Sequence, residues 1–103
     1  MTMKGKNIIE VNNIKIGLLW YEEEKDYLEI NQIFILSKYQ NKGIGSKILT
    51  DIINTGKNKK KSIILGVLKS NIRAQSLYNK MGFIEYDQTD TEIKLKIELN
   101  ERL

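Results

Sequence analysis

The chain has 103 residues, 41% of them hydrophobic and 29% charged, which is the composition of an ordinary globular domain and predicts a single domain over residues 1–103. It contains no histidine, cysteine or proline. A Ser-His-Asp triad, a thiol nucleophile, a disulfide, a zinc finger and a His-ligated metal site are therefore excluded. Any catalysis must use carboxylates, hydroxyls, amines, backbone groups or a bound cosubstrate, and we expect no metal.

Seventeen basic residues against thirteen acidic ones give a net charge of +4. This mild excess fits an anionic ligand, and it fits equally a compositional bias toward Lys, Ile and Asn. The lysines are too dispersed to predict a nucleic-acid surface. Neither a membrane-spanning segment nor a signal peptide is recognisable, so we expect a cytoplasmic protein that does not contact membranes.

The first third of the chain predicts three strands. Residues 8–11 and 14–20 form a hairpin around Asn12-Asn13, two residues that tolerate positive φ. A charged turn at 22–26 leads to a third strand at 27–36, whose apolar end predicts burial on both faces. Its alternation changes phase at Asn31-Gln32, which fits either a β-bulge or a simple loss of alternation in a central strand.

The rest of the chain alternates helix and strand. Apolar residues at helical spacing predict a first helix after residues 37–45 that ends near Gly56, and residues 62–68 read as a buried strand. A second helix begins at Asn71 and closes at Gly82, and residues 83–86 and 93–99 form two antiparallel strands. The fold class is thus α/β: a mixed sheet of about six strands with two helices, in the order β-β-β-α-β-α-β-β.

One segment between the third strand and the first helix has the residues of an anion-binding turn. It reads Gln40-Asn41-Lys42-Gly43-Ile44-Gly45-Ser46-Lys47. Glycines allow close backbone approach, and the first helical amides, which lack intrahelical partners, lie at the positive end of the helix dipole. Taken alone, Gly-x-Gly fits a plain strand-to-helix turn equally well.

A second motif follows in the second helix, where Asn71, Ala74, Leu77-Tyr78, Lys80 and Gly82-Phe83 recur at fixed spacing. Together the two segments resemble the signature motifs of the GNAT superfamily of N-acetyltransferases, and the order of elements over nearly the whole chain resembles that fold. The resemblance implies acetyl-CoA as acyl donor and a primary amine, of a small molecule or a protein, as acceptor. Nothing in the sequence selects the acceptor.

The resemblance also implies positions that contact the coenzyme. Backbone N–H groups of residues 41–46 would bind the pyrophosphate, residues 34–36 would run along the pantetheine arm beside the strand at 63–67, and Asn71 would contact that arm. The implied cofactor-binding residues are Phe34, Ile35, Leu36, Gln40, Asn41, Lys42, Gly43, Ile44, Gly45, Ser46, Asn71 and Tyr78.

By the same resemblance, Tyr78 is the general acid and Glu29 the general base, acting directly or through water. Other interpretations stay open for each. Tyr78 also fits a core aromatic and Asn71 a helix cap, while Glu29 fits a solvated strand face, with Tyr27, residues 22–24 and the C-terminal segment as other contributors to the acceptor site. The cationic run at 57–61 lies at the far end of the first helix, where it complements the dipole, and is not assigned to the cofactor.

The sequence departs from the family at its start, because members usually carry a further strand and two helices before the strand at 8–11. Loss of these elements would bare part of the sheet, so we expect a second copy to cover it in a homodimer. The loss of these elements also keeps open an alternative function, an acyl-CoA-binding or interaction domain with little or no turnover.

Overall fold

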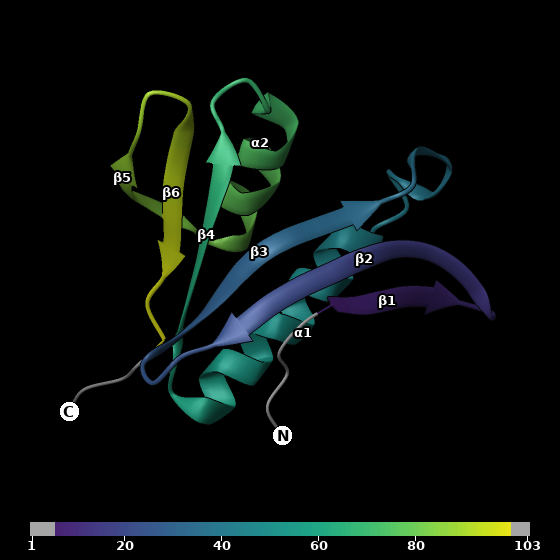
Figure 1. The fold of residues 1–103 in the computed structure, drawn as a ribbon, viewed down its shortest axis with the longest axis horizontal. Helices are drawn as coiled ribbons and strands as arrows, with labels where there is room; N and C mark the ends of the chain where they lie inside the picture. Colours follow the sequence, from purple (N-terminus) through teal and green to yellow (C-terminus); the bar gives the residue numbers. More distant parts are fainter. Residues whose placement is uncertain (1–5, 100–103) are drawn as a thin grey trace.

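The computed structural model describes residues 6–99, and it confirms the predicted class and order of elements (Figure 1). Within these residues the chain forms β1 (Lys6–Val11), β2 (Ile14–Glu23), β3 (Tyr27–Ile35), the 3-10 turn η1 (Ser37–Tyr39), α1 (Ile44–Lys59), β4 (Ser62–Leu68), α2 (Ile72–Met81), β5 (Ile84–Gln88) and β6 (Glu92–Ile97). Among the described residues, no helix is long and apolar enough to cross a membrane.

The strands form one six-stranded sheet in the order β1-β2-β3-β4-β6-β5. Neighbouring strands are antiparallel except for β3 and β4, which are parallel because α1 carries the chain back between them. The β1–β2 hairpin turns at Asn12 and Asn13, both with positive φ as expected (52° and 67°). β2 and β5 extend one or more residues beyond their predicted ends, which shortens the turns after them.

The centre of the sheet is split. Only Tyr27–Ile30 of β3 pair with Ser62–Leu65 of β4, and beyond these residues the two strands diverge (Figure 1). The split coincides with a bulge in β3: Tyr21 of β2 pairs with Ile30 and Trp20 pairs with Gln32, so Asn31 is an extra residue. The phase change in the sequence is therefore a β-bulge.

Only one face of the sheet is covered by helices. Residues of both helices pack with inward-facing strand residues in one buried cluster, which comprises Tyr21, Leu28, Ile30, Leu49, Ile52, Ile63, Leu65, Val67, Tyr78, Phe83 and Leu95. The opposite face, which we call the open face, carries the alternate residues of each strand.

The open face overturns one prediction. Phe34 and Leu36, at the end of β3, remain 48% and 43% exposed, so this end of the strand is not buried on both faces. Leu68 of β4 is likewise 53% exposed. The apolar run in the sequence suggested a strand covered on both faces, but the described residues supply helices for one face only.

The first helix does not end near Gly56; it continues to Lys59, and Lys60 closes it with a left-handed φ of 58°. Gly56 is instead a packing position. A Cβ atom there would lie 2.7 Å from the Lys61 carbonyl oxygen and 2.8 Å from Cδ1 of Ile63. Glycine is thus required by close approach of α1 to β4, and not by a helix terminus.

The end of α1 is tied to the end of β2 by an ion cluster. Lys59 and Lys61 place their Nζ atoms 2.8 and 2.5 Å from the two carboxylate oxygens of Glu23. Hydrogen bonds from Lys59 and Lys61 lower the pKa of Glu23 to about 2. Two lysines of the cationic run are therefore paired within the fold.

The cluster predicts a specific acid response. Because the folded-state pKa of Glu23 lies below its ordinary value of 4.5, its stabilising contribution is complete above that value and is lost as the pH falls toward 2. Urea unfolding between pH 7 and pH 2 should show Glu23→Gln less stable than wild type at neutral pH, with most of the difference lost by pH 2. Glu24→Gln, whose side chain makes no ion pair with a described residue, should track wild type throughout. A Glu23→Gln difference as large at pH 2 as at pH 7 would contradict this account.

Candidate active site

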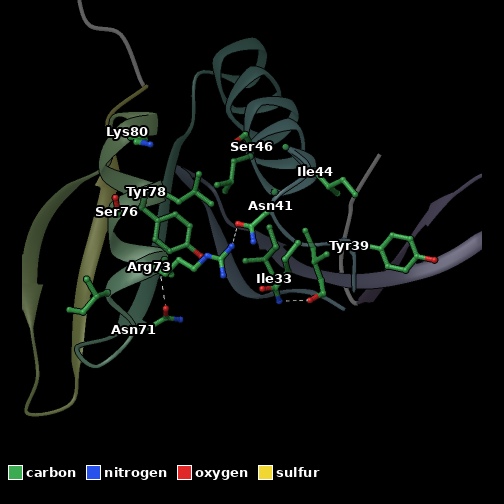
Figure 2. A pocket seen from close by; sticks show the side chains of 18 residues that line it. Ile33, Tyr39, Asn41, Ile44, Ser46, Asn71, Arg73, Ser76, Tyr78 and Lys80 are labelled. Atoms are coloured by element: carbon green, nitrogen blue, oxygen red, sulfur yellow. Dashed lines mark hydrogen bonds between the residues drawn. The ribbon is translucent and has the colours of Figure 1, made fainter. Parts of the chain in front are cut away.

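A cavity of about 590 Å³ lies on the helical face, at the place where β3 leaves β4 (Figure 2). Its walls come from β3, the turn before α1, the first turns of α1, and α2. The lining residues are Ile33, Ile35, Tyr39, Gln40, Asn41, Gly43, Ile44, Gly45, Ser46, Leu49, Asn71, Ile72, Arg73, Ala74, Ser76, Leu77, Tyr78 and Lys80.

The predicted anion-binding turn forms one wall of the cavity. Gly43, the N-cap of α1, has a φ of 78°, no side chain caps the first turn, and the Lys47 N–H to Gly43 carbonyl bond is 3.0 Å long. The earlier amides of the helix lack intrahelical partners at the positive end of its dipole. Gln40 fastens this turn to β3, because its Nε2 donates to the Ile35 carbonyl at 2.8 Å. The wall is thus a fixed row of backbone donors suited to an anion.

Tyr78 of α2 forms the opposite wall. The residue is only 7% exposed and packs edge-to-face on Phe83, with ring centroids 5.7 Å apart. Its hydroxyl has no hydrogen-bond partner among residues 6–99, although it belongs to a residue that lines the cavity. Burial raises the pKa of the phenol, so it stays protonated at neutral pH. A buried donor without a protein partner indicates a position that a ligand completes.

The structure brings most of the predicted cofactor residues together and leaves three out. Ile35, Gln40, Asn41, Gly43, Ile44, Gly45, Ser46, Asn71 and Tyr78 line the cavity. Phe34, Leu36 and Lys42 do not; the N–H of Leu36 donates instead to Ile16 of β2 at 2.8 Å. Because the β3 residues alternate in direction, Ile33 and Ile35 face the cavity and Phe34 faces the open side. Asn71 caps α2 by accepting from the Ala74 N–H, which confirms the helix-cap interpretation, and its contact with the coenzyme stays a prediction.

Sequence reasoning missed Arg73. This residue stands in the first turn of α2 and reaches across the cavity, where its guanidinium donates to the Asn41 side-chain oxygen (Figure 2). A cation in the first helical turn opposes the helix dipole, and α2 has no acidic residue there. That unfavourable placement was the available signal that an anion belongs nearby.

Glu29 does not share this cavity with Tyr78. It lies on the open face of β3, where it lines a second, smaller cavity close to the same divergence of β3 and β4. The proposed acid and base thus flank the split sheet from its two sides. In residues 6–99, no group of three or more acidic, His or Cys side chains is arranged to hold a metal ion.

Comparison with known proteins agrees with this geometry. Residues 8–83 match the family model described as the acetyltransferase (GNAT) family. Because this match covers more than half of the chain, the protein belongs to that family.

Solved structures share the fold. A GNAT family acetyltransferase from Elizabethkingia anophelis, with acetyl-CoA bound, is 27% identical, with a TM-score of 0.80 over 91% of this chain and 75% of that one. The ribosomal-protein-S18-alanine N-acetyltransferase of Escherichia coli is 21% identical, with a TM-score of 0.83 over 94% of this chain and 70% of that one. The PaiA N-acetyltransferase of Thermoplasma acidophilum, in complex with coenzyme A, is 21% identical, with a TM-score of 0.80 over 86% of this chain and 57% of that one. This chain therefore spans between 57% and 75% of the length of these proteins.

Proposed function

We propose that the protein transfers an acetyl group from acetyl-CoA to a primary amine by direct attack. The observation that carries the proposal is the cavity on the helical face, which has an anion-binding turn on one wall and the buried Tyr78 on the other. A phosphate-bearing thioester needs both features: backbone donors for its phosphates and a proton donor near its sulfur.

The residues present suit acetyl-CoA. The first amides of α1 and the Arg73 guanidinium supply donors for the pyrophosphate, and Ile33 and Ile35 offer an apolar wall to the pantetheine arm. Bound acetyl-CoA supplies a carbonyl that is already activated as a thioester, so the absence of a histidine or cysteine nucleophile is no obstacle.

The proton transfers fall to two side chains. Glu29 accepts a proton from the acceptor ammonium, directly or through water, which generates the neutral amine. The amine nitrogen bonds to the acetyl carbon while the carbon–sulfur bond breaks, and the Tyr78 hydroxyl gives its proton to the departing thiolate. In this proposal the amine approaches the acetyl group from the point where β3 and β4 stop pairing.

The alternative function is an acyl-CoA-binding domain with little or no turnover. The observation that favours it is that Glu29, the candidate base, lines a different cavity from Tyr78, the candidate acid. A panel of primary amines separates the two: release of coenzyme A with any of them supports the transferase, and binding without release supports the alternative.

The donor site is tested by thermal unfolding with and without acetyl-CoA. A ligand at a hundred times its Kd adds roughly 2.7 kcal/mol, which raises the Tm of a domain of this size by several degrees. Arg73→Ala removes a charge-assisted hydrogen bond, so its Kd for acetyl-CoA should rise about tenfold or more and its Tm shift should shrink. Lys25→Ala, which removes one positive charge in the turn between β2 and β3, serves as the matched control and should keep the full shift.

A wild-type protein whose Tm does not move at millimolar acetyl-CoA would overturn the proposed function. An unchanged affinity in Arg73→Ala would remove Arg73 from the binding site and leave the rest of the site intact.

Tyr78→Phe tests the general acid. The variant keeps the ring and its contact with Phe83 and removes only the hydroxyl, so the acetyl-CoA-induced Tm shift should persist while kcat falls roughly 10²-fold or more. The loss should hold from pH 6 to 9, because the raised pKa keeps the phenol protonated across that range. Tyr21→Phe, at a buried phenol away from the cavity, is the control and should retain kcat. Full turnover in Tyr78→Phe would show that another group protonates the thiolate.

We also propose that a second copy of the chain covers part of the open face. Register places Ile8, Leu18 and Phe34 side by side on neighbouring strands of that face, and Ile8 and Phe34 are 55% and 48% exposed. A contiguous apolar row of this kind is costly in water and suits a two-fold interface.

Sedimentation tests the dimer. At micromolar concentration the wild-type chain should sediment as a dimer, and Ile8→Glu should shift it toward monomer because a carboxylate would be buried at the contact. The Tm of Ile8→Glu, measured in the same buffer, shows whether the fold is retained. A wild-type monomer at this concentration would refute the interface.

A further inference from the structure

The side chains of Asn41 and Arg73 meet across the cavity on the helical face (Figure 2). Asn41 belongs to the turn before α1, whereas Arg73 stands in the first turn of α2. β3 and β4, which lead into these two segments, no longer pair at this end of the sheet. Among residues 6–99, this contact is the one hydrogen bond between residues 40–43 and α2.

The backbone at position 41 gives no reason to prefer asparagine to glycine. The φ of Asn41 is 64°, in the left-handed region that glycine adopts without strain and that asparagine only tolerates. Helix capping gives no reason either, because Gly43 is the N-cap of α1 and no side chain caps this helix. The use of an asparagine here therefore lies in what its side chain contacts.

That contact is with Arg73 alone. The Asn41 side-chain oxygen accepts from the guanidinium, and neither side chain makes another hydrogen bond or an ion pair with a residue in 6–99. An unrestrained arginine samples many rotamers, and ordering its side chain on a ligand costs conformational free energy. Asn41 restricts those rotamers within the protein itself and directs the guanidinium toward the anion-binding turn.

An amide orients the guanidinium without neutralising its charge. Arginine has five N–H donors, so the bond to Asn41 leaves the others for a phosphate. Residues 36–50 and 68–84, which build this side of the cavity, contain three basic residues each and no acidic one. A carboxylate in the place of the amide would hold the guanidinium more tightly, but it would cancel the positive charge that attracts an anion.

We propose that Asn41 is a positioning residue for the acyl donor: its side chain holds the Arg73 guanidinium beside the anion-binding turn, in place for the pyrophosphate. The inference rests on the proposed use of acetyl-CoA. It gives the Asn41 side chain a role that is separate from any phosphate contact of the backbone N–H at this position. Ordering one long side chain in advance is expected to raise affinity roughly three- to tenfold.

Asn41→Gly removes the amide and keeps both the backbone N–H and the left-handed conformation. By isothermal titration calorimetry, its Kd for acetyl-CoA should rise roughly three- to tenfold. Its Tm without ligand should change little, because glycine relieves strain where an exposed hydrogen bond is lost. Asn13→Gly is the matched control: Asn13 has a similar φ of 67°, in the β1–β2 hairpin outside the cavity, so the Kd should stay at the wild-type value.

Arg73→Ala shows whether the effect of Asn41 passes through Arg73. This variant loses the phosphate contact as well as its ordering, so its Kd should rise further than that of Asn41→Gly. In the Arg73→Ala background, Asn41→Gly should raise the Kd no more, because the group that it positions is absent. A contact that only braced the two walls of the cavity would instead give one Kd for both single variants and the double variant.

Nuclear magnetic resonance reports the positioning directly. In the ligand-free wild type, the Arg73 Nε–H should be ordered, and in Asn41→Gly its order parameter should fall to the range of a flexible side chain. Saturating acetyl-CoA should restore a high order parameter in Asn41→Gly, because the phosphate then holds the guanidinium. Arg73→Ala identifies the resonance by its loss.

These outcomes separate the inference from the function on which it rests. A wild-type protein without an acetyl-CoA-induced Tm shift would overturn the proposed function itself. With that shift present, three results would each overturn the role of Asn41: a wild-type Kd in Asn41→Gly, an equal rise of the Kd in the Arg73→Ala background, or an Arg73 Nε–H that is equally ordered with and without the Asn41 amide.

Discussion

The separation of β3 from β4 is the constraint on which the rest of the molecule depends. Parallel pairing stops at Ile30 and Leu65, and the extra residue Asn31 turns the rest of β3 away. Backbone groups that would otherwise bond across the two strands are left facing a gap. Ile33 and Ile35, beyond this point on β3, line the cavity on the helical face, and Glu29, Asn31 and Ile64, near the same point, line the second cavity on the open face.

Polar side chains near the split differ from those at the far end of α1 in whether they have a hydrogen-bond or ion-pair partner. At the far end of α1, Glu23 is paired with two lysines, and Ser62 at the start of β4 bonds the Glu98 carboxylate. Around the split, the Tyr78 hydroxyl and the carboxylates of Glu29 and Glu92 have no protein partner in the described part of the chain. A buried hydroxyl without a partner costs folding free energy, so Tyr78 fits a position that a ligand completes.

Much of the fold and part of the candidate site could be predicted from sequence patterns. Alternation and helical spacing act locally, which is why the order of elements, the hairpin at Asn12-Asn13 and the bulge at Asn31 were predictable. The position of Gly56 was misread, because the close approach of α1 to β4 is a tertiary contact that leaves no local trace. The second, smaller cavity, on the open face, was missed for a similar reason. Gly66 and Glu92 are distant in sequence, and only the antiparallel pairing of β4 with β6 brings them together.

The short parallel pairing also has a mechanical consequence. On one side of it, β1, β2 and β3 are joined by hairpins, and on the other side β4, α2, β5 and β6 follow one another directly along the chain. Each half is held together by local connections, whereas within the sheet the two halves meet only over Tyr27–Ile30 and Ser62–Leu65. That seam holds four residue pairs, whereas both helices share one buried cluster with strands of both halves. The two halves of the sheet are therefore joined by few hydrogen bonds at the seam, and the hydrophobic packing under the helices on one face holds them together.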